Sequence, residues 1–140
     1  MSSEWTMLIP LRVFTKIKND FSQTIKDTYS MTDNNFSMRN TNTKAVFPFA
    51  FVSSLASSPM ARDLQGNSIN AGRFGFQIEV YDNQTQTRAR KVMTEIQRIM
   101  VEEMGFEPTS IPNFQETNDN TVRMISRFTR EIGAGDKLNF

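Results

Sequence analysis

Two acidic residues, Asp63 and Glu79, are the first candidates for chemistry in this sequence. They lie sixteen residues apart, and the alternating residues around Glu79 are typical of a strand. Metal-dependent nucleases gather acidic side chains and a lysine around Mg²⁺ in a similar way. The lysine is missing here, because Glu79 is followed by Val-Tyr-Asp-Asn. We therefore expect Glu79 to be an outward, solvated strand residue, and a small metal-dependent nuclease is a remote alternative.

The residue types of nucleophilic catalysis are absent or wrongly placed. The sequence has no cysteine and no histidine, which is the commonest general base and metal ligand. The four serines between residues 53 and 58 do not form a G-x-S-x-G nucleophile turn. Gly72 and Gly75 match neither a phosphate-binding loop nor a dinucleotide fingerprint. We expect a protein that is not an enzyme and that needs no cofactor and no metal.

The charge balance and the hydropathy pattern exclude two further classes. The 16 basic and 15 acidic residues give a net charge of +1, whereas nucleic-acid-binding modules carry a clear basic excess. The longest apolar runs fall short of the 18 or so residues that a membrane span needs. Residues 1–20 also lack the pattern of a signal peptide. We expect no membrane association, and synthesis and assembly in a cytoplasm.

Exposed arginines remain as candidates for an interaction surface. Arg73, Arg123 and Arg127 fall on the polar side of two predicted strands, and arginine is enriched in protein interfaces. Arg62 and Asp63 lie in a predicted loop. We expect Arg62→Glu to weaken assembly without unfolding the protein. Ile96→Ala, by contrast, should cost about 2–5 kcal/mol of stability.

The elements that position these residues are clearest between residues 72 and 106. Residues 74–81 alternate strictly between apolar and polar positions, which predicts a strand with one buried face. Asp82 and Asn83 form the turn, and the spacing of Asn83 and Gln86 predicts that a helix begins at Gln84. Gly105 ends this helix. Its apolar face comprises Ala89, Val92, Met93, Ile96, Ile99, Met100 and Met104.

The rest of the chain supplies a second helix and more strands. An apolar residue at every fourth position predicts an amphipathic helix over 9–29, with Pro10 in its first turn. Strands are predicted over 45–55, where Pro48 marks a start, a bulge or an edge, and over 121–132. Long loops are predicted at 30–44, with a possible short strand near Phe36, and at 56–72. A short extended segment is predicted within 111–115. The last residues, 133–140, are predicted to form a flexible tail.

These elements predict a single α+β domain over residues 1–140. Its form is a two-layer sandwich, in which a mainly antiparallel or mixed sheet of about four strands carries two helices on one face. The apolar side of the strands, including Phe74, Phe76 and Phe128, could serve as a platform for stacked RNA bases. We favour a role in the core instead, because two amphipathic helices need that surface.

The order of these segments resembles the tail terminator proteins of long-tailed bacteriophages, also called tail completion, minor capsid or head–tail joining proteins. The resemblance covers about 85 residues, from Lys44 to Phe128. Its pieces are FPFAFV, DLQGNSINAG, FGFQIEVYDN, ARKVMTEIQRIMVEEMGF and VRMISRF. Residues 1–43 match only in length and in having a helix, and the polar run 30–44 has no counterpart in the family pattern.

The resemblance implies a structural role in the virion. Family members form a ring, expected to be a hexamer, on the head-proximal end of the tail tube. They stop polymerisation of the tube protein and join the tail to the head-connector or head-closure protein. Genomic DNA passes through such a ring without sequence-specific binding. The resemblance places this protein in the tail or neck of a virion, and in the host cytoplasm during assembly.

One alternative within the phage remains open at this point. A connector, head-closure or tail-tip subunit could share a small α+β fold. Gene order would separate these roles, because a tail tube gene immediately downstream favours the terminator.

Overall fold

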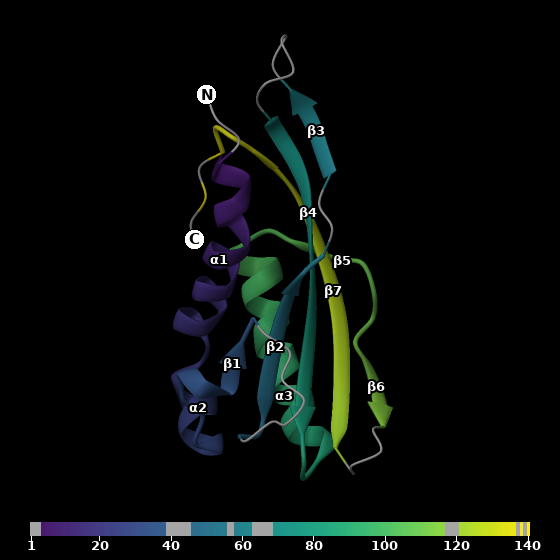
Figure 1. The fold of residues 1–140 in the computed structure, drawn as a ribbon. Helices are drawn as coiled ribbons and strands as arrows, with labels where there is room; N and C mark the ends of the chain where they lie inside the picture. Colours follow the sequence, from purple (N-terminus) through teal and green to yellow (C-terminus); the bar gives the residue numbers. More distant parts are fainter. Residues whose placement is uncertain are drawn as a thin grey trace.

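The structure combines one sheet with helices on one of its faces (Figure 1). It is a computed structural model, and it describes residues 4–38, 46–55, 58–62, 69–116, 121–136, 138 and 140. The helical elements are α1 (Glu4–Asp20), α2 (Gln23–Tyr29), the 3₁₀ turn η1 (Asp33–Asn35), α3 (Gln86–Arg98) and the π-helical η2 (Ile99–Glu103). The strands are β1 (Phe36–Ser37), β2 (Phe49–Ser54), β3 (Ser58–Arg62), β4 (Ile69–Asp82), β5 (Glu107–Pro108), β6 (Asn113–Glu116) and β7 (Val122–Gly133). The predicted α+β class is confirmed.

The sheet contains more strands than predicted. Within the described residues it has seven, in the order β1-β2-β4-β7-β5, with β3 also on β4 and β6 also on β7. Only the β1–β2 pair is parallel, so the sheet is mixed. The additional strands have two to five residues each. Such short segments carry too few residues for a period of two to be recognised.

Strands β4 and β7 form the backbone of the sheet. They pair antiparallel over twelve residues each, Ala71–Asp82 with Val122–Gly133. The 14 residues of β4 span about 46 Å. The first part of β4 pairs with β3, and this hairpin projects beyond the helices (Figure 1). The prediction of a continuous loop over 56–72 was therefore wrong, because an edge strand such as β3 tolerates a proline at Pro59.

The helix predicted over 9–29 is two helices. Its stripe consists of Ile9, Val13, Ile17, Phe21 and Ile25. Each step of four residues turns an α-helix by about 40° past a full circle, so four steps rotate the stripe by about 160°. One straight helix could not keep such a stripe on the core. The chain bends at Phe21, and Ser22 caps α2 by accepting a hydrogen bond from Ile25 N.

The break is fixed to the neighbouring helix. Ser22 N donates to Glu95 Oε2 of α3 at 2.7 Å, and Arg98 holds the same carboxylate through both of its oxygens. The start of α1 also differs from the prediction. The helix begins at Glu4, so Pro10 lies in its interior and not in its first turn.

Helix α3 covers the sheet as predicted but begins two residues later. Asp82 Oδ2 accepts hydrogen bonds from the N–H groups of Gln84 and Thr85, which extends the turn. Thr85 then caps the helix by accepting from Arg88 N. Gly105 follows η2 with φ of 72°, the left-handed conformation predicted for a helix end. All seven residues of the predicted apolar face are buried.

Two predicted irregular segments are partly ordered. Within 30–44 the structure forms η1 and β1, so the short strand near Phe36 is confirmed, and residues 39–44 lie outside the described part. The extended segment predicted within 111–115 is confirmed in part by β6. The strand predicted over 45–55 is the shorter β2, which begins directly after Pro48, so a strand start is the one of the three predicted roles of Pro48 that the structure shows.

Two residues of the tail predicted to be flexible, 133–140, pack on the core. Leu138 and Phe140 contact the main apolar cluster, and the Arg12 guanidinium donates to the Phe140 carbonyl oxygen. Phe140 also lies 6.5 Å from the ring of Phe106. The prediction failed because two apolar side chains can anchor an otherwise polar segment.

The core lies between the helices and one face of the sheet. Phe76 and Phe106 meet edge-on there, with 5.5 Å between ring centroids. None of the helices in the described part of the chain has the length and hydropathy needed to span a bilayer. The largest fully buried side chains are Phe76, Phe106, Phe128, Ile9, Ile17, Ile78, Met93, Ile96, Ile99, Met100, Met104 and Ile132.

Candidate interaction surface on the helix-free face

The predicted arginines of β4 and β7 share the face of the sheet that carries no helix in the described residues. Arg73 on β4 stands opposite Glu131, while Arg127 and Arg123 on β7 stand opposite Gln77 and Tyr81. Successive positions are four residues apart along the strands, or about 13 Å. The three arginines therefore form a row of about 26 Å along this face.

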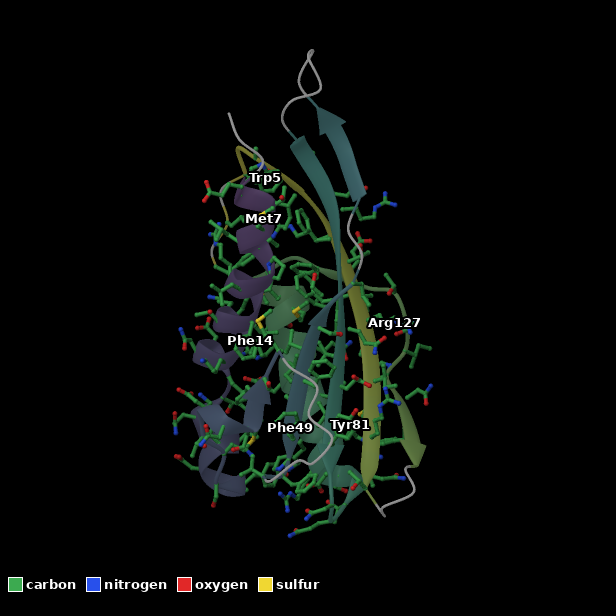
Figure 2. The ribbon with its side chains drawn as sticks, viewed as in Figure 1. Trp5, Met7, Phe14, Phe49, Tyr81 and Arg127 are labelled. Atoms are coloured by element: carbon green, nitrogen blue, oxygen red, sulfur yellow. The ribbon has the colours of Figure 1, made fainter. Side chains whose placement is uncertain are left out.

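The part of the row formed by Arg73 and Arg127 is exposed. Arg73 Nη2 lies 2.7 Å from Glu131 Oε1, and the two side chains are 56% and 57% exposed. Arg127 Nε donates to Gln77 Oε1 at 2.8 Å and its side chain is also exposed (Figure 2). Each arginine is thus held by a cross-strand partner while most of its surface remains open to solvent.

At the other end of the row, Arg123 is half-buried and its partner Glu79 is buried, contrary to prediction. Glu79 is only 3% exposed, and Arg123 Nη2 forms an ion pair with its Oε1. The pair is diagonal, because Arg123 stands opposite Tyr81 and not opposite Glu79. The Arg123 guanidinium lies 5.9 Å from the centre of the Tyr81 ring. The expectation that Glu79 is a solvated residue was therefore wrong.

An aromatic cluster explains this burial. Phe49 and Phe51 of β2 lie beside Tyr81 and Glu79 in the sheet register, and Val46 and Phe47 pack against the cluster. Figure 2 shows Phe49 and Tyr81 next to each other on the lower part of this face. Burial raises the pKa of the Tyr81 hydroxyl above its ordinary value.

The sequence contains a signal for this second cluster. The first four residues of β2, Phe-Ala-Phe-Val, are apolar at every position and all four are buried. A strand without alternation is typical of burial on both faces. Residues Ala50 and Val52 enter the main core, while Phe49 and Phe51 form the cluster on the other side.

Of the remaining two predicted surface residues, Arg62 and Asp63, the structure describes only the first. Arg62 is the last residue of β3 and pairs with Ile69, and Asp63 lies outside the described residues. The structure thus separates Arg62 from Arg123 along the sheet, since β3 pairs only with the first part of β4. Their role in an interface stays a prediction.

The carboxylates of the described residues are not arranged to hold a metal ion. The carboxylate of Glu79 is already engaged by a guanidinium in a nearly solvent-free position, so it is a poor ligand for Mg²⁺. Elsewhere in the described residues, no three acidic side chains are grouped so that they could hold a metal ion. What this face offers is a row of cations, each paired across strands, next to an aromatic cluster.

A hollow of about 470 Å³ lies beside the exposed end of the row. Two arginines and two glutamates are among the residues that line the hollow. One of these arginines, Arg130, donates from Nη1 to the Met104 carbonyl oxygen. The balance of charges does not favour an anionic ligand over a cationic one. Its lining residues are Arg73, Gly105, Glu107, Thr129, Arg130 and Glu131.

Two comparisons with known proteins find no relative of this chain. A scan against models of protein families finds no match, and a search of curated proteins finds no significant similarity.

Proposed function

We propose that this chain is a structural virion protein that caps the head-proximal end of a phage tail tube. In this role it ends polymerisation of the tube protein and joins the tail to the head-connector or head-closure protein. It acts as a ring of identical subunits, a hexamer in the family that it resembles, with DNA passing through the lumen.

The order and spacing of the segments that resemble the tail terminators carry this proposal. The same segments form β2, β4, α3 and β7, which are the centre of the sheet and the helix that covers it. The helix-free face supports the proposal because it presents two exposed, cross-strand pairs, Arg73 with Glu131 and Arg127 with Gln77. Such a surface can contact other proteins without acid–base chemistry.

Tube assembly in vitro tests the proposed function. The tail tube protein encoded in the same genome would be polymerised with and without this protein, and tube lengths would be measured by electron microscopy. We expect shorter tubes with the protein at one end. An unchanged length distribution, together with no binding to tube ends, would rule the proposal out.

A charge-reversal pair sharpens this test. Arg73→Glu changes the exposed end of the row, and Lys91→Glu changes an exposed cation on α3, in the other layer. We expect only Arg73→Glu to impair capping, with both variants melting within a few degrees of the wild type. If both variants cap equally well, the row takes no part in contact with the tube.

A second candidate is a connector, head-closure or tail-tip subunit, since the same features would suit any of these. This candidate predicts binding to the portal or head-closure protein without any effect on tube length. Pull-down with each purified neck protein separates the two roles.

A further inference from the structure

Helix α1 exposes an apolar stripe on the side away from the core. Met7 is 80% exposed, Leu8 is 51% exposed and Leu11 is 56% exposed. Residues three and four apart lie on the same side of a helix, so Leu8, Leu11 and the exposed Arg12 are neighbours. Large apolar side chains gathered on one side in this way are typical of an interaction site.

A shallow pocket of about 410 Å³ continues this stripe. Its apolar wall is formed by Leu11 and Phe140, and Arg12 lies with its guanidinium carbon 5.5 Å from the centre of the Phe140 ring. The pocket lining comprises Leu11, Arg12, Thr15, Lys16, Asn19, Asp20 and Phe140.

The other side of the molecule carries an apolar knob. Ile111 lies between β5 and β6 and is 88% exposed. Hydrogen bonds hold its neighbours to β7, because Thr109 N donates to the Arg127 carbonyl oxygen at 2.9 Å and Arg127 N donates to Ser110 Oγ at 3.1 Å. The knob is therefore presented from a fixed backbone.

The two sites lie on opposite sides of the molecule. Figure 1 shows α1 along one side and the β5–β6 connection along the other, and Figure 2 shows Met7 and Arg127 on those two sides. Within the described part of the chain, each site also has one exposed charge without a partner of opposite sign, a cation at the first site and an anion at the second. Arg12 has no acidic partner within the described residues, and Glu107, at the β5 end of the knob segment, has no basic one there.

We infer that the α1 stripe and pocket of one copy bind the Ile111 knob of the next copy, head to tail. Ile111 enters the pocket beside Leu11 and Phe140, and Glu107 approaches Arg12. A second copy is the occupant favoured by the geometry, because one kind of contact then covers both exposed sites, whereas a foreign partner would cover only one. An interface between two different surfaces repeats from copy to copy and closes into a ring if the rotation allows it. The inference rests on the proposed function in that it names the surfaces through which ring subunits touch.

Mixing two variants of the isolated protein tests this contact. Leu11→Asp removes the pocket side and Ile111→Asp removes the knob side, and both positions are exposed, so folding should persist and would be checked by circular dichroism. Sedimentation velocity should show concentration-dependent association of the wild type and monomers for each variant alone. An equimolar mixture should form a one-to-one dimer and nothing larger, because each partner keeps one intact surface.

Charge exchange gives a second measurement. Arg12→Glu and Glu107→Arg should each weaken association at least several-fold, and the double variant should recover most of it. Lys91→Glu is the matched control and should associate like the wild type.

Three results would overturn the contact. These are a wild type that stays monomeric at every concentration, a variant pair that fails to form the mixed dimer, and an Ile111→Asp protein that associates normally. Binding of vesicles of phosphatidylglycerol and phosphatidylcholine that depends on Leu11 but not on Ile111 would also overturn it. If such variants still shorten tubes, the contact fails and the capping role stands. If the contact holds and tubes are unaffected, the capping role fails alone.

Discussion

The two faces of strand β4 differ in how far their side chains are buried and in the contacts that these side chains make. On the helix-covered face, Phe74, Phe76, Ile78 and Val80 are all buried against other apolar side chains. On the helix-free face, burial falls gradually along the strand, from Tyr81 and Glu79 at one end to the exposed Arg73 at the other. The covered face is stabilised by apolar packing, and the helix-free face by a small aromatic cluster at one end and cross-strand pairs along the rest.

The difference shows where sequence periodicity is informative and where it is not. Apolar alternation identifies a face that must be buried, because exposing four large apolar side chains in a row would cost several kcal/mol. Polar alternation only permits exposure. A charged residue on that face can still be buried when a neighbour such as Arg123 neutralises it.

The largest effect that tests this comparison is expected on the covered face. Phe76→Ala should lower the free energy of unfolding by about 3–5 kcal/mol, because Phe76 is fully buried and meets Phe106 edge-on. The next residue, Gln77, points to the other face, so Gln77→Ala should cost less than about 1 kcal/mol. Urea denaturation measures both. Equal costs would mean that the two faces of β4 do not differ in packing.

A smaller loss is expected from the buried ion pair. Glu79→Ala leaves the Arg123 guanidinium beside Tyr81 without its carboxylate, at a cost of about 1–3 kcal/mol. The cost should stay below the 3–5 kcal/mol of a completely buried pair, because the Arg123 side chain is 29% exposed.

Replacing both partners is the control. Glu79→Leu combined with Arg123→Leu removes both charges and should be closer to the wild type than either single change. If the double variant is the least stable of the three, the pair contributes more than its own desolvation cost.

The fold could be predicted more completely from long segments than from short ones. Strands β4 and β7 and helix α3 are twelve to fourteen residues long, and the sequence predicts each of them, although β4 begins inside the predicted loop 56–72 and α3 begins two residues late. The short strands β1, β5 and β6 form because a neighbouring strand offers unpaired backbone groups. That requirement arises from tertiary structure, so the sequence indicated β1 and β6 only approximately and gave no indication of β5.

The candidate surfaces could be predicted only in part. The positions of Arg73 and Arg127 follow from alternation, but the burial of Glu79 depends on Phe49 and Phe51, which lie some thirty residues earlier in the chain. The outward side chains of α1 were readable in principle. Met7, Leu8 and Leu11 fall opposite Ile9, Val13 and Ile17 on a helical wheel, and the prediction of a helix beginning at Ile9 left the first two out.

A still smaller loss of stability is expected from a change at Arg73, at the exposed end of the row of arginines. Arg73→Ala should lower the free energy of unfolding by about 0.2–1 kcal/mol, because an exposed ion pair gains little over hydration. The effect should shrink at high salt, where charges are screened over a few ångströms. A double-mutant cycle with Glu131→Ala isolates the pair. A coupling energy as large as that of Glu79 and Arg123 would remove the distinction between the two halves of this face.

The smallest effect should appear only in alkaline solution and concerns Tyr81. The Glu79–Arg123 pair beside it carries no net charge, so desolvation by the aromatic cluster dominates and raises the pKa of the Tyr81 hydroxyl above 10.0. Since the folded-state pKa exceeds the unfolded-state pKa, the contribution of Tyr81 to stability is complete below pH 10.0 and is lost as the pH rises through the folded-state pKa. Tyr81→Phe should therefore lose less stability than the wild type on that rise. In a Tyr29→Phe variant Tyr81 is the remaining tyrosine of the two, so its tyrosinate absorbance gives the pKa directly. A value at or below 10.0 would mean that water reaches the cluster, and that the helix-free face is open along its whole length.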